Sequence, residues 1–143
     1  MIKFTPAVEA EELYSKVERV ALKHGIDPML YFNILQVESE LDQNAFNKTT
    51  HDYGIAQINH KTALLYKFSI YKLKTDIDYN LNAGAIVLKQ AQKAFKAKEP
   101  ATWYCRYNIG YGKLSKKEKA CRAYIKKVRS EERRVGKECL RLC

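Results

Sequence analysis

Apolar residues recur at intervals of three and four along most of this chain, and no segment sustains the apolar–polar alternation of a half-buried strand. The spacing predicts helices over residues 9–24, 28–40, 80–96 and 120–128, with weaker helical patterns over 61–68 and 102–107. Gly25 is placed to end the first helix, and Asp27-Pro28 supplies an N-cap and a first helical residue for the second. With 143 residues, the chain has room for one hydrophobic core. We therefore predict a single all-α, or nearly all-α, domain.

The balance of charge restricts the partners of the chain. It carries 26 Lys and Arg against 16 Asp and Glu, a formal net charge of +10. Such a charge suits nucleic acid, a membrane surface or the acidic cell wall. The lysines are scattered and no nucleic-acid-binding motif accompanies them, which favours a solvated basic surface. No apolar run has the length of a membrane helix, and the first ten residues lack the apolar core of a secretory signal. Either the protein stays where it is made, or its native N-terminus is missing.

One carboxylate lies inside an apolar helical stripe. The stripe of the helix over 28–40 consists of Leu30, Ile34, Val37 and Leu41. Glu38 stands between its last members, where burial of an unpaired charge is costly and raises the pKa of the carboxyl group. A carboxylic acid that keeps its proton near neutral pH can act as a general acid. The alternative is a structural glutamate that is hydrogen-bonded to a backbone group or an arginine.

Polar groups suited to binding a sugar occur at three further places. Ser39 follows Glu38 directly, and Gln57 interrupts an otherwise apolar run, where a buried amide needs a specific partner. Tyr107 and Asn108 precede two glycines. Each has an ordinary alternative as a cap, a turn residue or a packing residue, so only their combination points to a binding site.

Four segments together resemble the soluble-lytic-transglycosylase-type (SLT) domain, a lysozyme-like family. Val37–Ala45 resembles the "ES" motif of this family, and Asp52–Asn59 resembles its "GLMQI" motif. Asn80–Leu88 resembles the helix that follows, and Tyr107–Gly110 resembles the "YNxG" motif. Order and spacing agree over residues 24–128. The resemblance is closest to the small transglycosylases of type III and type IV secretion or conjugation systems. It implies a lysozyme-like helical fold with a substrate groove.

The resemblance also implies roles for individual residues. Glu38 matches the single catalytic acid and base of the family. The implied substrate-binding residues are Ser39, Asn47, Gln57, Tyr107 and Asn108. Two departures concern this set: Ile55-Ala56 replaces the common Leu-Met, and Asn47 stands where some members place a serine.

The implied reaction is cleavage of the β-1,4 bond between N-acetylmuramic acid and N-acetylglucosamine of peptidoglycan, with formation of a 1,6-anhydro end. No cofactor is implied, because the substrate supplies the nucleophile.

The first rival is a lysozyme-type hydrolase, for which Asp42 or Asp52 would supply the second carboxylate that a standard glycosidase needs. The other rivals are a non-catalytic peptidoglycan-binding module and, least favoured, a nucleic-acid binder. The resemblance implies a monomer that acts on glycan strands in the periplasm or cell envelope, beside a secretion or conjugation apparatus.

Residues 129–143 differ from the rest of the chain. The run from Arg129 to Cys139 resembles the translation of a common sequencing adapter, so we expect a non-native tail after a domain of residues 1–128.

Excluding this tail leaves Cys105 and Cys121, either as a disulfide, which implies an oxidising compartment, or as two buried thiols. Neither the cysteines nor the histidines have the spacing of a metal site, and we predict no metal.

Overall fold

The computed structural model describes residues 6–142, and the side chains of residues 11–132. The opening residues 1–5, in which we looked for a secretory signal, and Cys143 of the expected tail lie outside the described residues. The helices are α1 (Pro6–Lys23), α2 (Pro28–Ser39), α3 (His60–Tyr66), α4 (Ile70–Thr75), α5 (Ile77–Phe95), α6 (Arg106–Ile109) and α7 (Leu114–Leu142), with a 3-10 turn η1 (Trp103–Cys105). The strands are β1 (Phe46–Asn47), β2 (Asp52–Tyr53) and β3 (Ile58–Asn59). The prediction of a nearly all-α fold is confirmed.

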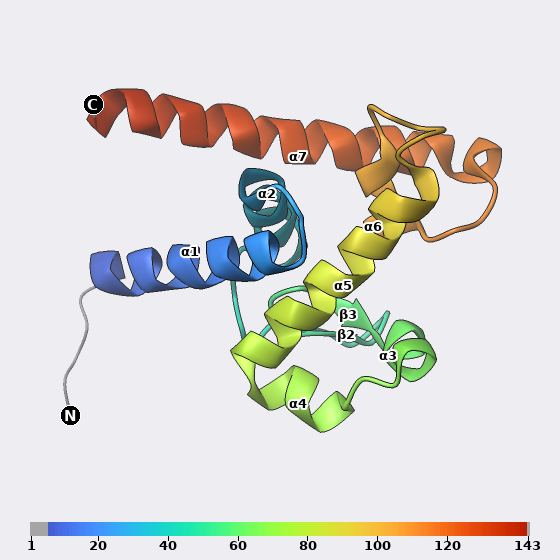
Figure 1. Ribbon diagram of the computed structural model, residues 1–143, viewed down its shortest axis with the longest axis horizontal. Helices are drawn as coiled ribbons and strands as arrows, with labels where there is room; N and C mark the ends of the chain where they lie inside the picture. The colour runs from blue at the N-terminus through green and yellow to red at the C-terminus, as the bar shows by residue number, and fades with distance from the viewer. Residues whose placement is uncertain (1–5, 143) are drawn as a thin grey trace.

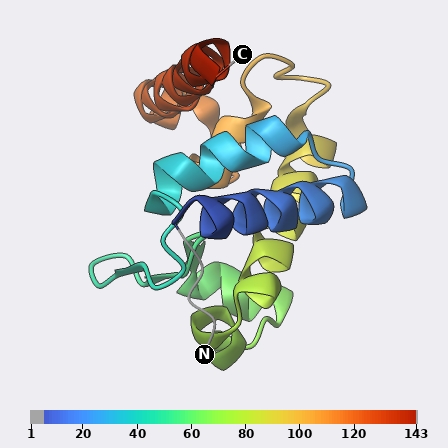
Figure 2. The same cartoon turned by 90° about the vertical axis from the view of Figure 1, so that its left-hand side faces the viewer.

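The elements form two lobes on either side of α5 (Figure 1). In the larger lobe, α2 packs between α1 and α7. The smaller lobe holds the three short strands with α3 and α4, at the other end of the molecule (Figures 1 and 2). Because α5 contacts both lobes, it forms the central support of the fold. Within the described part of the chain, no helix combines the length and the apolar character that spanning a membrane requires.

The predicted helix boundaries of the larger lobe follow from local chemistry. Gly25, the second residue after α1, adopts a φ of +69°, a conformation that favours glycine. The Asp27 side chain accepts a hydrogen bond from the Met29 N–H at 3.0 Å, and Pro28 opens α2 as predicted. At the other end, Glu40 takes a left-handed conformation with a φ of 54° and ends the helix. Glu38 therefore lies in the last turn of α2.

The buried surface of α5 differs from a simple apolar stripe. Leu81, Ala85 and Leu88 are fully buried, whereas Ile86 is 36% exposed. This helix is covered from two directions by the two lobes, so its buried face is wider than that of a surface helix and includes residues on both sides. Asn80 is also buried there, where its amide donates to the backbone oxygens of Tyr53 at 2.9 Å and Leu73 at 3.0 Å.

The small sheet lies in the region that the sequence left undefined. Its order is β1-β2-β3, and both pairs are antiparallel, with Asn47 opposite Asp52 and Asp52 opposite Asn59. The strands have two residues each and α4 has less than two helical turns. Segments this short do not show a clear period in the sequence, which is why neither the strands nor α4 were predicted. Asp52 thus lies on the central strand of the sheet.

The last helix is longer than predicted. The apolar residues Cys121, Tyr124, Ile125 and Val128 are buried as the helical pattern indicated. The helix nevertheless begins at Leu114 and extends to Leu142, through the segment that we expect to be a non-native tail. That expectation stays a prediction.

Candidate active site

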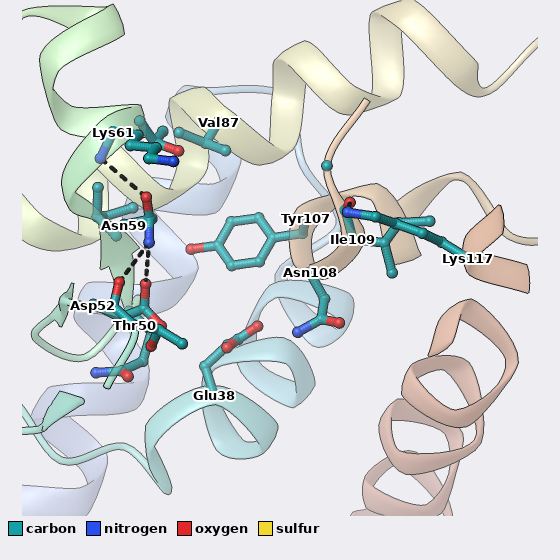
Figure 3. Close-up of a pocket in the computed structure, with 14 residues that line it drawn as sticks. Glu38, Thr50, Asp52, Asn59, Lys61, Val87, Tyr107, Asn108, Ile109 and Lys117 are labelled. Atoms are coloured by element: carbon teal, nitrogen blue, oxygen red, sulfur yellow. Dashed lines mark hydrogen bonds between the residues drawn. The ribbon is translucent and has the colours of Figure 1, made fainter. Parts of the chain in front are cut away.

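A cleft of about 520 Å³ lies between the two lobes (Figure 3). Its walls come from α2, the sheet, α3, α5, α6 and the start of α7. It is lined by Glu38, Thr50, Asp52, Gln57, Ile58, Asn59, Lys61, Thr62, Val87, Tyr107, Asn108, Ile109, Gly110 and Lys117. Four of the predicted site residues are therefore brought together from distant parts of the chain: Glu38, Gln57, Tyr107 and Asn108.

Glu38 points from the last turn of α2 toward Tyr107 and Asn108 (Figure 3). Its carboxylate accepts a hydrogen bond from the Tyr124 hydroxyl at 2.9 Å. Burial raises the pKa of Glu38 to about 7; the Tyr124 hydrogen bond opposes this shift, the negative charge of Asp52 adds to it, and Lys127 opposes it weakly. Glu38 is thus a carboxylic acid that can hold a proton near neutral pH beside an open cleft.

Tyr124 is the partner of Glu38 that sequence reasoning missed. It is 5% exposed, on α7, and 86 positions from Glu38 in the chain. Burial, and next the charge of Glu38, raise the pKa of Tyr124 well above its ordinary value, so the hydroxyl stays a donor. The only signal in the sequence was a polar hydroxyl on the apolar stripe of the last helix. From the sequence, a backbone group or an arginine was considered as the hydrogen-bond partner of Glu38; in the structure the partner is the Tyr124 hydroxyl.

Asp52 is the second carboxylate of the cleft. It accepts hydrogen bonds from the Thr50 hydroxyl at 2.6 Å and from the Asn59 amide at 3.0 Å. Asp42, the other carboxylate considered for a hydrolase, does not line the cleft and accepts a hydrogen bond from the Asn44 N–H at 2.8 Å. If a second carboxylate takes part in the chemistry, the geometry favours Asp52.

Gln57 holds the loop between β2 and β3 against the preceding segment. Its side-chain amide donates to the Gly54 oxygen at 2.9 Å and to the Ala45 oxygen at 3.3 Å. Its own backbone has a φ of 52°, in the left-handed region that is strained for a residue with a side chain. The side chain thus fixes the loop shape and at the same time lines the cleft.

Tyr107 joins α6 to the same loop. Its hydroxyl donates to the Ala56 oxygen at 2.6 Å. This contact needs Gly84 on α5, because a Cβ atom there would lie 2.6 Å from the Ala56 Cβ and 3.1 Å from the Tyr107 hydroxyl. At Gly84, therefore, α5 lies close to both α6 and the loop. Asn108, next along α6, is exposed and also lines the cleft.

Two predicted substrate-binding residues do not line the cleft. The Ser39 hydroxyl donates to the Ile55 oxygen at 2.7 Å and so ties the helix of Glu38 to the loop of Gln57. The Asn47 side chain accepts hydrogen bonds from the backbone N–H groups of Thr49 and Thr50, at 3.0 and 3.3 Å, and stabilises a turn. The structure thus places Ser39 as a positioning residue and Asn47 at the edge of the sheet.

The structure joins Cys105 and Cys121 in a disulfide, which links η1 to α7. Cys121 lies one helical turn before Tyr124, so the bond anchors the helix that supplies the partner of Glu38. Among the described side chains, no three His, Cys, Asp or Glu residues lie close enough together to hold a metal ion.

Comparison with known proteins gives one match. The family described as "Transglycosylase SLT domain" matches residues 15–129, which is most of the chain. Neither the curated proteins nor the solved structures include a significant match. The matched segment contains the whole cleft and Tyr124.

Proposed function

The chain belongs to the transglycosylase SLT family, whose members are lytic transglycosylases acting on peptidoglycan, and on this premise we propose that it cleaves the β-1,4 bond between N-acetylmuramic acid and N-acetylglucosamine. The observation that supports the proposal is the carboxyl group of Glu38, whose burial raises its pKa to about 7 at the wall of a cleft. We further propose that the product carries a 1,6-anhydro ring.

Glu38 serves as both acid and base in this reaction. In its protonated form it donates its proton to the glycosidic oxygen while the bond from that oxygen to C1 breaks. The resulting carboxylate is stabilised by the Tyr124 hydroxyl, 2.9 Å away. It then accepts the proton of the C6 hydroxyl of the same sugar as that oxygen bonds to C1. No water is consumed, and Glu38 ends the cycle protonated again.

The surrounding residues position the sugar for this exchange. Gln57 and Asn108 both line the cleft with amide groups, and the Tyr107 ring and the Asn108 side chain lie beside Glu38 (Figure 3). Ser39 and Tyr107 hold α2, the loop and α6 in register through their hydrogen bonds to Ile55 and Ala56. Such preorganisation matters because a displacement of about 1 Å can cost a large part of the rate.

Hydrolysis is the second candidate, since Asp52 lines the same cleft and its charge raises the pKa of Glu38. In that reaction a carboxylate would activate a water or bind C1 directly, and a reducing end would form. Asp52 already accepts hydrogen bonds from Thr50 and Asn59, which suits a structural role in the sheet. Transglycosylation therefore remains the preferred proposal.

Digestion of purified peptidoglycan in ¹⁸O-labelled water separates the two reactions. Transglycosylation yields anhydro-ended muropeptides that carry no label, whereas hydrolysis yields reducing ends that contain one labelled oxygen. Mass spectrometry of the soluble products measures both. Labelled reducing ends as the main product would overturn the proposal and assign the chain as a hydrolase.

We place the enzyme in the periplasm or cell envelope, as a monomer beside a secretion or conjugation apparatus. The support is the substrate class of the family and a disulfide, a bond that persists in oxidising compartments. Cell fractionation with alkylation of free thiols tests this location. Protein found in the envelope fraction with Cys105 and Cys121 protected from alkylation is the expected result, and reduced protein confined to the cytosol would contradict it.

A further inference from the structure

Two lysines line the cleft from different walls. Lys61 is the second residue of α3, and Lys117 is the fourth residue of α7. They lie on opposite sides of Tyr107 and Glu38 (Figure 3). These two residues, called here the cleft lysines, place a positive charge on each side of the Glu38 carboxyl group within the same cleft.

The charges of the cleft lysines are not neutralised by neighbouring carboxylates. Both residues are exposed, and no salt bridge between described side chains includes either of them. Asp52, which lines the same cleft, is held instead by the Asn59 amide at 3.0 Å. The cleft thus offers two ammonium groups that are available to pair with an anionic ligand.

Local hydrogen bonds hold both lysines at the cleft wall. The Lys117 Nζ donates to the Ile109 oxygen at 2.8 Å, which fixes this ammonium group at the end of α6 and uses one of its three N–H donors. The Lys61 N–H donates to the Asn59 side-chain oxygen at 3.0 Å, a cap that fixes the backbone from which the Lys61 side chain extends. A group that is already held, as in Lys117, loses less conformational freedom when a ligand binds.

Only one of the two sugars in a peptidoglycan strand carries charge. N-acetylglucosamine is neutral, whereas the lactyl group of N-acetylmuramic acid ends either in a carboxylate or in an amide that leads to the carboxylates of a stem peptide. The two sugars alternate, so muramic residues occur on both sides of the bond that Glu38 is proposed to cleave. Positive charges on both sides of Glu38 complement this pattern.

We propose that the cleft lysines bind carboxylates of the muramic residues on the two sides of the cleaved bond, and so select muramic-containing strands over neutral β-1,4-linked N-acetylglucosamine strands. This inference rests on the proposed function and names the residues that recognise the charge of its substrate. The two polymers share the same sugar backbone, which the amides of Gln57 and Asn108 can bind in either case. A positive charge at the wall distinguishes between them.

An alternative role of the cleft lysines is to adjust the pKa of Glu38. Burial is the main cause that raises this pKa, and the charges that act on it are those of Asp52 and Lys127, not those of the cleft lysines. Removal of the cleft lysines should therefore change the binding of charged strands and leave the alkaline limit of activity in place.

The first test measures binding in the Glu38→Gln background, so that no ligand is cleaved. Three uncrosslinked ligands of equal length are compared: a neutral N-acetylglucosamine oligosaccharide, a peptide-free strand with lactyl carboxylates, and a strand with stem peptides. Lys61→Gln/Lys117→Gln should weaken the binding of a carboxylate-bearing strand by roughly tenfold at low salt, because two exposed ion pairs are lost, and leave the binding of the neutral ligand unchanged. A loss on the peptide-free strand assigns the lactyl carboxylate, and a loss confined to the peptide-bearing strand assigns the carboxylates of the peptide.

Lys93→Gln/Lys119→Gln is the matched control, since it removes two positive charges from exposed positions outside the cleft. It should bind all three ligands as the parent protein does. Equal weakening of all three ligands by the cleft-lysine variant, or no weakening on either carboxylate-bearing strand, would overturn the inference.

The second test uses the active enzyme on peptidoglycan strands. Lys61→Gln/Lys117→Gln is expected to raise KM several-fold, and added salt should raise the KM of the wild type toward that of the variant. Lys61→Arg/Lys117→Arg keeps both charges and should restore most of the binding. A shift in the alkaline limit of the pH–rate profile would assign the lysines to the acid instead. No cleavage by the wild type, together with charge-dependent binding in the first test, counts against the proposed function alone.

Discussion

The two carboxylates of the cleft stand on walls of different character. Glu38 comes from the helical lobe, is largely withdrawn from water, and accepts a hydrogen bond from the Tyr124 hydroxyl. Asp52 comes from the small sheet and accepts hydrogen bonds from two polar neighbours, Thr50 and Asn59. The first environment favours a protonated acid near neutral pH, and the second satisfies a carboxylate through hydrogen bonds. The fold thus gives two chemically similar groups different surroundings.

The largest effect expected from this comparison is that of Glu38→Gln, which keeps the shape of the side chain and removes the transferable proton. We expect the rate of peptidoglycan cleavage to fall by about 10²–10⁴-fold, the usual contribution of general acid–base catalysis. Release of soluble muropeptides measures it. Glu40→Gln, an exposed carboxylate two positions further, is the matched control and should retain the wild-type rate. A Glu38→Gln variant as active as wild type would contradict the assignment of Glu38 as the catalytic acid and base.

The same substitution should change stability in a pH-dependent manner. Because burial raises the pKa of Glu38 from 4.5 to about 7, the folded protein binds more protons than the unfolded chain between these values. The free energy of unfolding of the wild type therefore falls as the pH rises through this window. We expect Glu38→Gln to be more stable than wild type by up to about 3 kcal/mol above pH 7, and equal to it near pH 4. Urea unfolding at both pH values measures the difference; equal stability at high pH would mean that Glu38 carries no burial penalty.

Asp52→Asn tests the other wall. It removes the negative charge that raises the pKa of Glu38, so the pH at which activity is lost on the alkaline side should move to lower values. For a transglycosylase, we expect the rate near pH 5 to stay within about tenfold of wild type, since Asp52 takes no part in the proton transfers. A loss as large as that of Glu38→Gln would instead assign Asp52 a catalytic role in hydrolysis. The pH–rate profile measures both quantities.

Tyr124→Phe should move the alkaline limit of activity in the opposite direction. Its hydroxyl stabilises the ionised form of Glu38, so its removal raises the pKa of Glu38 further. We expect the alkaline limit of activity to rise by about one pH unit, the equivalent of one hydrogen bond to a charged group. Tyr104→Phe, a half-buried tyrosine outside the cleft, serves as control. A downward shift would show that Tyr124 favours the neutral acid.

The sequence predicted those parts of the molecule that depend on local spacing. The long helices and their caps at Asp27 and Gly25 follow from residues within one turn of each other. Glu38 was identified because its neighbours at i−4 and i+3 are apolar, which is also a local property. The resemblance to known motifs then placed Gln57 and Asn108 in the same site.

Features that depend on tertiary structure could not be predicted in this way. Tyr124 and Glu38 meet only because α7 packs against α2, and no spacing encodes a contact across 86 residues. Asp42 and Asp52 were equivalent in the sequence, and the register of the short strands alone brings Asp52 into the cleft. Asn47 was assigned by position in a motif, but its side chain is engaged in a turn.

The disulfide between Cys105 and Cys121 encloses α6, and thus both Tyr107 and Asn108, in a covalent loop. Closing a loop of this length restricts the unfolded chain by roughly 3 kcal/mol. Reduction would remove this restriction and the covalent link between η1 and α7, whereas the strands of the opposite wall contain no cysteine. The folded state should therefore be less stable wherever thiols are kept reduced.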